Sequence, residues 1–266
     1  MKRAKIHEIE LEYNVRGTGE SVLLIHGAHL ADALQPLMAE PALKAFQMIQ
    51  YHRRGFAGSS RPPAPTSTED QADDALGLLD HLSVDRAHLV THSYGGMIAL
   101  ALAAAHPTRV RSLALLEPLP HTGTARAAFM DGMAHLAKRY TEGDATAAVH
   151  GFFALLGPDW RTAIDHAVPG GIEQAERDAP TFFEIDLVEG SRSSFGPEQA
   201  AAISCPVLSV LGTASGPLFA AGREQLHEWF PRCQNADIAG ATHYLQMKQP
   251  AAVATAIAEF LQKPRR

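Results

Sequence analysis

The chain has little cysteine, no block of basic residues and no long hydrophobic segment. Its two cysteines, Cys205 and Cys233, are too few for a disulfide framework, which predicts a reduced, cytoplasmic setting. The net charge of -6 and the lack of lysine or arginine runs exclude a surface built for nucleic acid. No apolar run reaches the roughly 18 residues that cross a bilayer, and the basic N-terminus lacks the apolar region of a signal peptide. We therefore expect neither a membrane nor a nucleic-acid partner.

The 14 histidines are not grouped with cysteine or aspartate at the spacings of metal ligands, so we predict no metal site. What the chain does have is a regular alternation of short apolar runs with helical patterns. This alternation predicts an α/β fold with a doubly wound, mostly parallel sheet. We expect strands at 5–15, 21–27, 46–55, 86–91, 112–116, 206–212 and 235–239, and helices at 68–82, 94–105, 218–230 and 249–262.

The alternation stops between residues 119 and 200. This stretch contains helical patterns at 125–140, 145–156 and 172–178, many aromatic and methionine residues, and no convincing buried strand. We interpret 119–200 as a helical lid inserted into a core formed by 1–118 and 201–266. The alternative is that these helices simply enlarge the core.

A lone serine, Ser93, lies at the junction of a buried strand and a buried helix in the segment HLVTHSYGG. In a doubly wound sheet, ligands gather outside the carboxyl ends of the strands, and a residue at such a tight turn is pushed into the open. The turn needs small neighbours two residues before and after: Gly95 fits, whereas Thr91 departs from the usual glycine. The alternative is a serine that only caps the helix. Because His92 precedes the serine on the strand, we expect it to point away from the site.

Two backbone N–H groups are placed to hold an anion beside this serine. His26 and Gly27 end an earlier buried strand and leave the Ala28 N–H free to face the site. The Tyr94 N–H follows the serine directly. Together they predict a two-donor oxyanion hole.

Three further segments occur in the order expected for one large enzyme class. They are the His26–Gly27 pair, the loop RGFAGSS at 54–60, and AGATHYLQMKQP at 239–250, which puts His243 after the last strand. With the serine turn, they resemble the α/β-hydrolase fold superfamily over nearly the whole chain outside 119–200. The resemblance implies that Ser93 is a nucleophile, that His243 is its base, and that no cofactor is needed.

The acid that orients the histidine departs from the usual pattern. Family members usually carry aspartate three residues after the glycine that ends the seventh strand, where this chain has Ser215. Glu117 instead ends the apolar strand before it, which resembles the zearalenone lactonases and some haloalkane dehalogenases. We therefore expect Glu117 to be the acid. The alternatives are that Glu117 pairs with an arginine such as Arg111, and that Asp237, within a strand, takes the role.

A serine nucleophile points to acyl chemistry. We expect hydrolysis of a carboxylic ester or lactone of an apolar or aromatic small molecule through an acyl-enzyme. The alternatives are a carbon–carbon bond hydrolase of the same fold and a ligand-binding protein without catalysis. The sequence leaves the oligomeric state open, a homodimer included. Our candidates for substrate contact are His26, His29, Met130, Phe153, Trp160 and Phe183.

Overall fold

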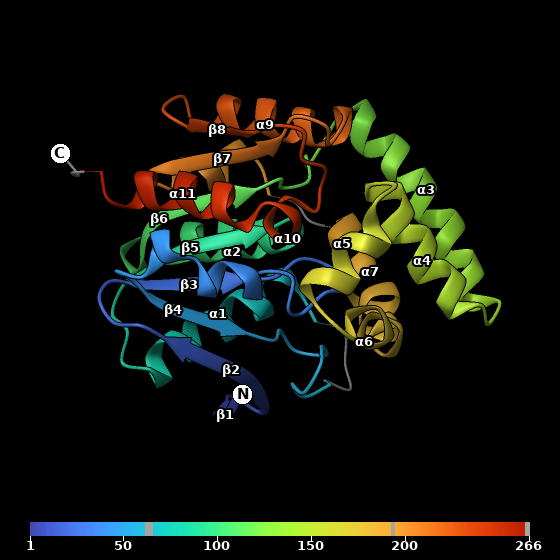
Figure 1. The fold of residues 1–266 in the computed structure, drawn as a ribbon, viewed down its shortest axis with the longest axis horizontal. Helices are drawn as coiled ribbons and strands as arrows, with labels where there is room; N and C mark the ends of the chain where they lie inside the picture. Colours follow the sequence, from blue (N-terminus) through green and yellow to red (C-terminus); the bar gives the residue numbers. More distant parts are fainter. Residues whose placement is uncertain (62–65, 193–194, 264–266) are drawn as a thin grey trace.

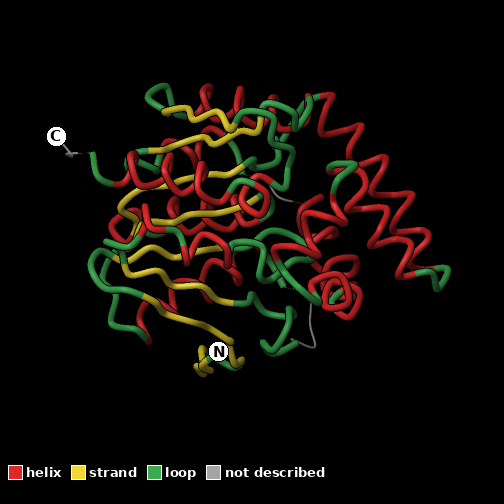
Figure 2. Tube along the Cα trace, in the orientation of Figure 1, coloured by secondary structure: helices red, strands yellow, loops and turns green. Residues whose placement is uncertain are grey.

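An eight-stranded sheet forms the centre of the protein in the computed structural model, which describes residues 1–61, 66–192 and 195–263 (Figures 1 and 2). The strand order is β1-β2-β4-β3-β5-β6-β7-β8, and only the β1–β2 and β2–β4 pairs are antiparallel. The predicted doubly wound, mostly parallel sheet is therefore confirmed. The strands are β1 (Lys2–Ile6), β2 (Ile9–Arg16), β3 (Ser21–Ile25), β4 (Gln47–Tyr51), β5 (Ala87–His92), β6 (Val110–Leu116), β7 (Val207–Gly212) and β8 (Gln234–Ile238).

The first predicted strand, 5–15, is wrong as a single element. It is a hairpin of β1 and β2, whose turn contains His7 at a φ of 52°. Because this turn contains neither glycine nor proline, the alternating apolar residues on both sides read as one continuous strand.

Helices cover both faces of the sheet because each face is apolar. One face packs against α1, α2, α8 and α9 through a cluster that includes Leu23, Leu89 and Leu113. The other packs against α11 and the short η1 and η2 through a cluster that includes Leu24 and Val90. Helix α2 is apolar on nearly all sides because it is buried between the sheet and other helices. These helices are α1 (Thr68–His81), α2 (Gly95–Ala105), α8 (Pro197–Ala201), α9 (Pro217–Trp229), α10 (Leu245–Lys248), α11 (Pro250–Leu261), η1 (Gln35–Ala39), η2 (Pro41–Leu43) and η3 (Pro107–Arg109).

A group of helices between β6 and β7 lies to one side of the sheet, beyond the carboxyl ends of its central strands (Figure 1). A third apolar cluster joins these helices to Leu30 after β3, Phe219 of α9 and Tyr244 near the C-terminal helices. The predicted patterns at 125–140, 145–156 and 172–178 correspond to three of the helices. The group consists of α3 (Thr124–Thr141), α4 (Ala145–Leu156), α5 (Trp160–Ala167), α6 (Gly171–Arg177), the π-helical η4 (Thr181–Asp186) and α7 (Leu187–Arg192).

Among the described helices, none combines the length and the hydropathy needed to cross a membrane.

Candidate active site

Ser93 lies at the sharp turn between β5 and α2. Its φ is 53°, in the left-handed region that costs a residue with a side chain about 1–2 kcal/mol. The turn is held because the Ser93 N–H donates to the Leu116 carbonyl oxygen at 2.9 Å. Strain of this kind persists where the surroundings over-determine it, and it is common at functional sites.

Close packing around this turn explains its glycines. A Cβ on Gly95 would overlap the carbonyl oxygen of Ile25, and one on Gly27 would lie 3.1 Å from the Ser93 Cβ. The loop after β3 therefore approaches the serine closely because both positions lack side chains. Thr91 is fully buried and fits beside Gly96, where the missing side chain leaves room.

His243 and Glu117 form a buried hydrogen-bonded pair. The two residues are only 1% exposed, and the His243 Nδ1–H donates to Glu117 Oε2 at 2.7 Å. The His243 ring also stacks on Phe219, with ring centroids 4.0 Å apart. Burial lowers the pKa of His243 to about 3, so the imidazole is neutral at pH 7. Its Nε2 has no hydrogen-bond partner within the described part of the chain and is therefore free to accept a proton.

Glu117 directly follows β6 and has a φ of 48°, and its carboxylate lies beside the end of the neighbouring β7. Its Oε1 accepts hydrogen bonds from the Gly212 N–H at 2.7 Å and from the Ser215 hydroxyl. Burial raises the pKa of Glu117 to about 7, and these two donors act in the opposite direction. Ser215, at the usual position of the acid, therefore supports Glu117.

The structure favours neither alternative to the His243–Glu117 pair, because both residues concerned have other partners. Arg111 pairs with Glu20 at 3.0 Å rather than with Glu117. Asp237 is exposed and pairs with Arg223. Neither residue approaches His243 through any hydrogen bond or ion pair within the described residues, whereas Glu117 does.

Ser93 and His243 line the same cavity, whose empty space, open solvent included, is about 300 Å³. No hydrogen bond joins the Ser93 hydroxyl to His243 Nε2 in the described residues. Such bonds are often long without substrate and tighten when the reacting complex forms. The structure thus places Ser93 and His243 in the lining of one cavity and joins His243 to Glu117, while Ser93 and His243 are not bonded to each other in the described residues.

Ala28 and Tyr94 lie beside Ser93 in the lining of a second cavity, whose empty space, open solvent included, is about 450 Å³. Among the described residues, neither the Ala28 N–H nor the Tyr94 N–H donates a hydrogen bond to another group. Two free N–H groups next to a hydroxyl can hold the negative oxygen that forms when an acyl carbon is attacked.

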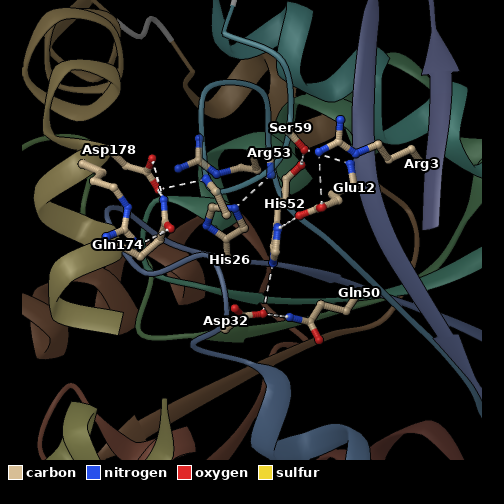
Figure 3. Close-up of polar contacts among 12 residues, drawn as sticks. Arg3, Glu12, His26, Asp32, Gln50, His52, Arg53, Ser59, Gln174 and Asp178 are labelled. Carbon is tan, nitrogen blue, oxygen red and sulfur yellow. Dashed lines mark hydrogen bonds and ion pairs between the residues drawn. The ribbon is translucent and has the colours of Figure 1, made fainter. Parts of the chain in front are cut away.

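A buried polar network fixes the loop that carries Ala28, and Figure 3 shows two of its members, His26 and Arg53. The His26 Nδ1–H donates to the Gly27 oxygen at 2.8 Å, and its Nε2 accepts from the Arg53 N–H at 2.9 Å. The Arg53 guanidinium donates to the same Gly27 oxygen at 2.9 Å and pairs with Asp186 at 2.7 Å. Burial lowers the pKa of His26, which keeps it neutral. His26 therefore shapes this loop.

A second histidine in Figure 3, His52, bridges two carboxylates. Its Nδ1 and Nε2 lie 3.0 Å from Glu12 Oε2 and from Asp32 Oδ1 respectively. These hydrogen bonds raise the pKa of His52 against the effect of its burial. His52 therefore ties β2 to the segment that follows the loop after β3.

The expectation that His92 points away from the site is wrong. Its ring lines the cavity shared by Ser93 and His243, with centroids 4.3 Å from the His243 ring. The His92 Nε2–H donates to the His243 carbonyl oxygen at 3.0 Å. Burial lowers the pKa of His92 to about 3. His92 therefore holds the loop of the base, a role that its position on the strand did not reveal.

Of the candidates for substrate contact, Met130 and Phe153 line the cavities beside Ser93. The others lie outside the lining of both cavities. His29 is enclosed by phenylalanines, with Phe182 at a centroid distance of 4.1 Å. Trp160 stacks on Phe153, and Phe183 stacks on Tyr140. Substrate contact therefore stays a prediction for these four residues, and their positions outside both linings do not favour it. They are His26, His29, Trp160 and Phe183.

Further residues of 119–200, none of them among the six candidates for substrate contact, also line the larger cavity. Most of them are apolar, and Arg126 and Asp186 are charged. The aromatic and methionine content of 119–200 indicated such a surface but not its members. These residues are Leu119, Arg126, Phe129, Met133, Phe152, Leu156, Phe182, Asp186, Leu187 and Gly190.

The inserted helices are also joined to the loop of His243. The Tyr244 hydroxyl donates to the Phe153 carbonyl oxygen at 2.6 Å, and the Thr242 hydroxyl donates to Asp159 at 3.1 Å. Lys248 forms an ion pair with the same aspartate. The base therefore depends on contacts with α4 and with the start of α5.

The sheet, the serine turn and the buried histidine–glutamate pair are those of an α/β hydrolase. The chain belongs to the alpha/beta hydrolase fold family, whose pattern matches residues 20–250. It is 26% identical to the 2-(acetamidomethylene)succinate hydrolase of Mesorhizobium japonicum over 266 residues, or 98% of this chain and 94% of that relative.

Two more comparisons extend this result. The chain is 39% identical to the 2-hydroxymuconate semialdehyde hydrolase of Pseudomonas sp. strain CF600 over 104 residues, which are 38% of this chain and 37% of that relative. Among solved structures, it is similar to a thermophilic esterase from Thermogutta terrifontis, with a TM-score of 0.82, 26% identity and 98% of both chains covered.

Proposed function

We propose that this protein is a serine hydrolase that cleaves a carboxylic ester or lactone of a small, largely apolar molecule through an acyl-enzyme. The observation that carries the proposal is the buried His243–Glu117 pair. The Nε2 atom of His243 has no hydrogen-bond partner among the described residues, and His243 lines one cavity together with Ser93. A neutral imidazole oriented by a carboxylate is the arrangement that activates a serine hydroxyl.

In the first half of the reaction, His243 Nε2 takes the proton of Ser93 as Oγ bonds to the acyl carbon. The Ala28 and Tyr94 N–H groups hold the oxyanion, and Glu117 stabilises the imidazolium. The intermediate collapses, the carbon–oxygen bond to the leaving group breaks, and His243 returns the proton to that oxygen. In a lactone, the new hydroxyl stays attached to the acyl chain.

In the second half, His243 takes a proton from water as its oxygen bonds to the acyl carbon. The bond to Ser93 Oγ then breaks and the serine regains its proton from His243, which releases the carboxylic acid. Every proton moves through Nε2, so the mechanism uses only groups of this chain and water.

The apolar lining of the larger cavity supports an apolar substrate body. Because residues of the inserted helices form much of that lining, we propose that residues 119–200 act as a lid over a core of 1–118 and 201–266. The full-length likeness to an esterase supports ester chemistry. The two free cysteines support a cytoplasmic location.

Carbon–carbon bond hydrolysis is the second candidate. It is favoured by the partial likeness to 2-hydroxymuconate semialdehyde hydrolase, although that match covers 38% of this chain. A ligand-binding protein without catalysis is the third, and the retention of Ser93, His243 and a buried acid opposes it.

A fluorophosphonate probe tests the proposal, because it reacts with an activated serine. We expect rapid labelling of the wild type and none of Ser93→Ala, with His243→Ala slowed strongly. Ser191, an exposed serine of α7 whose hydroxyl bonds to the Val188 oxygen, provides the control Ser191→Ala, which should label like the wild type.

A panel of p-nitrophenyl esters of increasing chain length and of simple lactones then identifies the bond. Labelling of Ser93 without hydrolysis of any ester or lactone would favour the carbon–carbon candidate. An unreactive Ser93 would favour the binding protein.

A further inference from the structure

Among the described residues, Arg126 is the one cationic side chain in the lining of the larger cavity, which also contains Ser93, Ala28 and Tyr94. It comes from the first turn of α3, in the inserted helices, and most of the other lining residues are apolar. A guanidinium in such surroundings is costly unless a partner compensates its charge.

The partners that Arg126 has are neutral. Its Nη1 donates to the Pro120 oxygen at 3.0 Å, and its Nη2 donates to the Gly190 oxygen at 2.6 Å. Within the described residues, no carboxylate forms an ion pair with it. Arg126 is half-buried, and this partial burial lowers the pKa of its guanidinium. Since a guanidinium carries five N–H donors, three are left by these two bonds.

The acid in the same lining, Asp186, is not the missing partner. Its carboxylate accepts two hydrogen bonds from Arg53, at 2.7 and 3.2 Å, and one from Gln71 at 3.2 Å. Asp186 is only 1% exposed. Its charge is therefore already balanced by Arg53, which is itself buried.

We propose that Arg126 binds a carboxylate of the substrate, so that the natural substrate is an ester or lactone that carries a negative charge at a distance from the bond that is cleaved. This inference rests on the proposed function and adds the substrate class. The two carbonyl contacts hold the guanidinium in place before the substrate arrives, and its planar fork matches a carboxylate.

The experiment compares substrates that are matched except for charge. Mono-p-nitrophenyl adipate and p-nitrophenyl hexanoate have six-carbon acyl groups, and 4-acetoxybenzoate and 4-acetoxybenzamide vary the leaving group in the same way. We expect the wild type to prefer the anionic member of at least one pair. Arg126→Met should lower that preference, as a ratio of kcat/KM values, by about 30-fold, as for the loss of a charge-assisted hydrogen-bonded pair.

Two variants separate charge recognition from a structural role. Arg126→Lys keeps the charge without the fork and should retain part of the preference. Arg139→Met, on the exposed side of the same helix where Arg139 pairs with Asp144, should keep the wild-type ratio. A purely structural Arg126 would lower kcat/KM for both members of each pair equally, and the unchanged ratio would overturn the inference.

Failure of the proposed function would give a different result, namely no hydrolysis of any test ester. If the wild type hydrolyses none of the four esters, calorimetric titration of the Ser93→Ala protein with the same compounds decides the inference. Tighter binding of the anionic member that Arg126→Met abolishes would support it. Equal binding of both members would overturn it.

Discussion

Replacing Glu117 with glutamine keeps the shape of the side chain and removes the negative charge beside His243. Both residues are buried, and Nδ1 lies 2.7 Å from Oε2. With charge centres about 4 Å apart and an effective dielectric constant of about 20, the imidazolium and carboxylate attract by about 4 kcal/mol. Loss of that attraction in the transition state slows the reaction by about 10³-fold.

The hydrogen bonds of Glu117 make the loss larger. Because Oε1 accepts from Gly212 and Ser215, the glutamine oxygen should take that place and leave its NH₂ group facing His243. Nδ1 must then accept, which moves the ring proton to Nε2 and blocks the base. We therefore expect kcat to fall by about 10³- to 10⁴-fold with little change in KM.

Burst and steady-state kinetics with a p-nitrophenyl ester measure this effect, with thermal unfolding as the check on folding. Ser215→Ala removes one of the two donors to Glu117 Oε1 while the Gly212 N–H remains, so its cost should stay within about tenfold. Asp237→Asn, at an exposed acid, should have no effect. A folded Glu117→Gln protein within tenfold of the wild type, or an equal loss in Ser215→Ala, would show that the acid is misassigned.

Three further predictions concern pH and stability. Because Glu117 must be ionised and burial raises its pKa to about 7, kcat/KM should be constant above pH 7 and fall about tenfold per pH unit below it. If the pH–rate profile of Glu117→Gln kept this fall, the titrating group would not be Glu117. The left-handed backbone of Ser93 predicts that Ser93→Gly is inactive but about 1 kcal/mol more stable than Ser93→Ala in denaturant unfolding, and equal stabilities would argue against strain. Burial lowers the pKa of His29 to about 3, so its contribution to stability is complete above the unfolded value of about 6.5 and is lost as the pH falls below it, by about 2 kcal/mol between pH 7 and 5. His29→Leu should reduce the acid-induced loss of unfolding free energy by that amount. An unchanged loss would show that burial does not lower the pKa of His29.

The parts of the site that the sequence predicted are those fixed by their place on a strand. Ser93 directly follows β5, Glu117 directly follows β6, and parallel strands bring their carboxyl ends to one edge of the sheet. His243 was identified by the loop after the last strand. These positions follow from local patterns, and the structure brings the three residues together.

The remaining parts depend on contacts between distant segments. Arg53 and Asp186 are 133 residues apart, and no local pattern links them. Arg126 belongs to the inserted helices, where aromatic content indicates burial but not which side chains face the cavity. His92 was misplaced because the direction of a strand residue does not reveal that the loop of His243 folds over it.

The ties between the inserted helices and the residues around His243 constrain how a molecule can reach the serine. Raising α4 or the start of α5 would break the Phe153–Tyr244 and Asp159–Thr242 bonds and displace the imidazole. Helix α4 and the start of α5 therefore help to hold His243 in place and should not move to admit substrate. Substrate should instead enter between α3 and α7, where Arg126 donates to the Gly190 oxygen. An anionic substrate would then meet the Arg126 guanidinium at the entrance of the cavity.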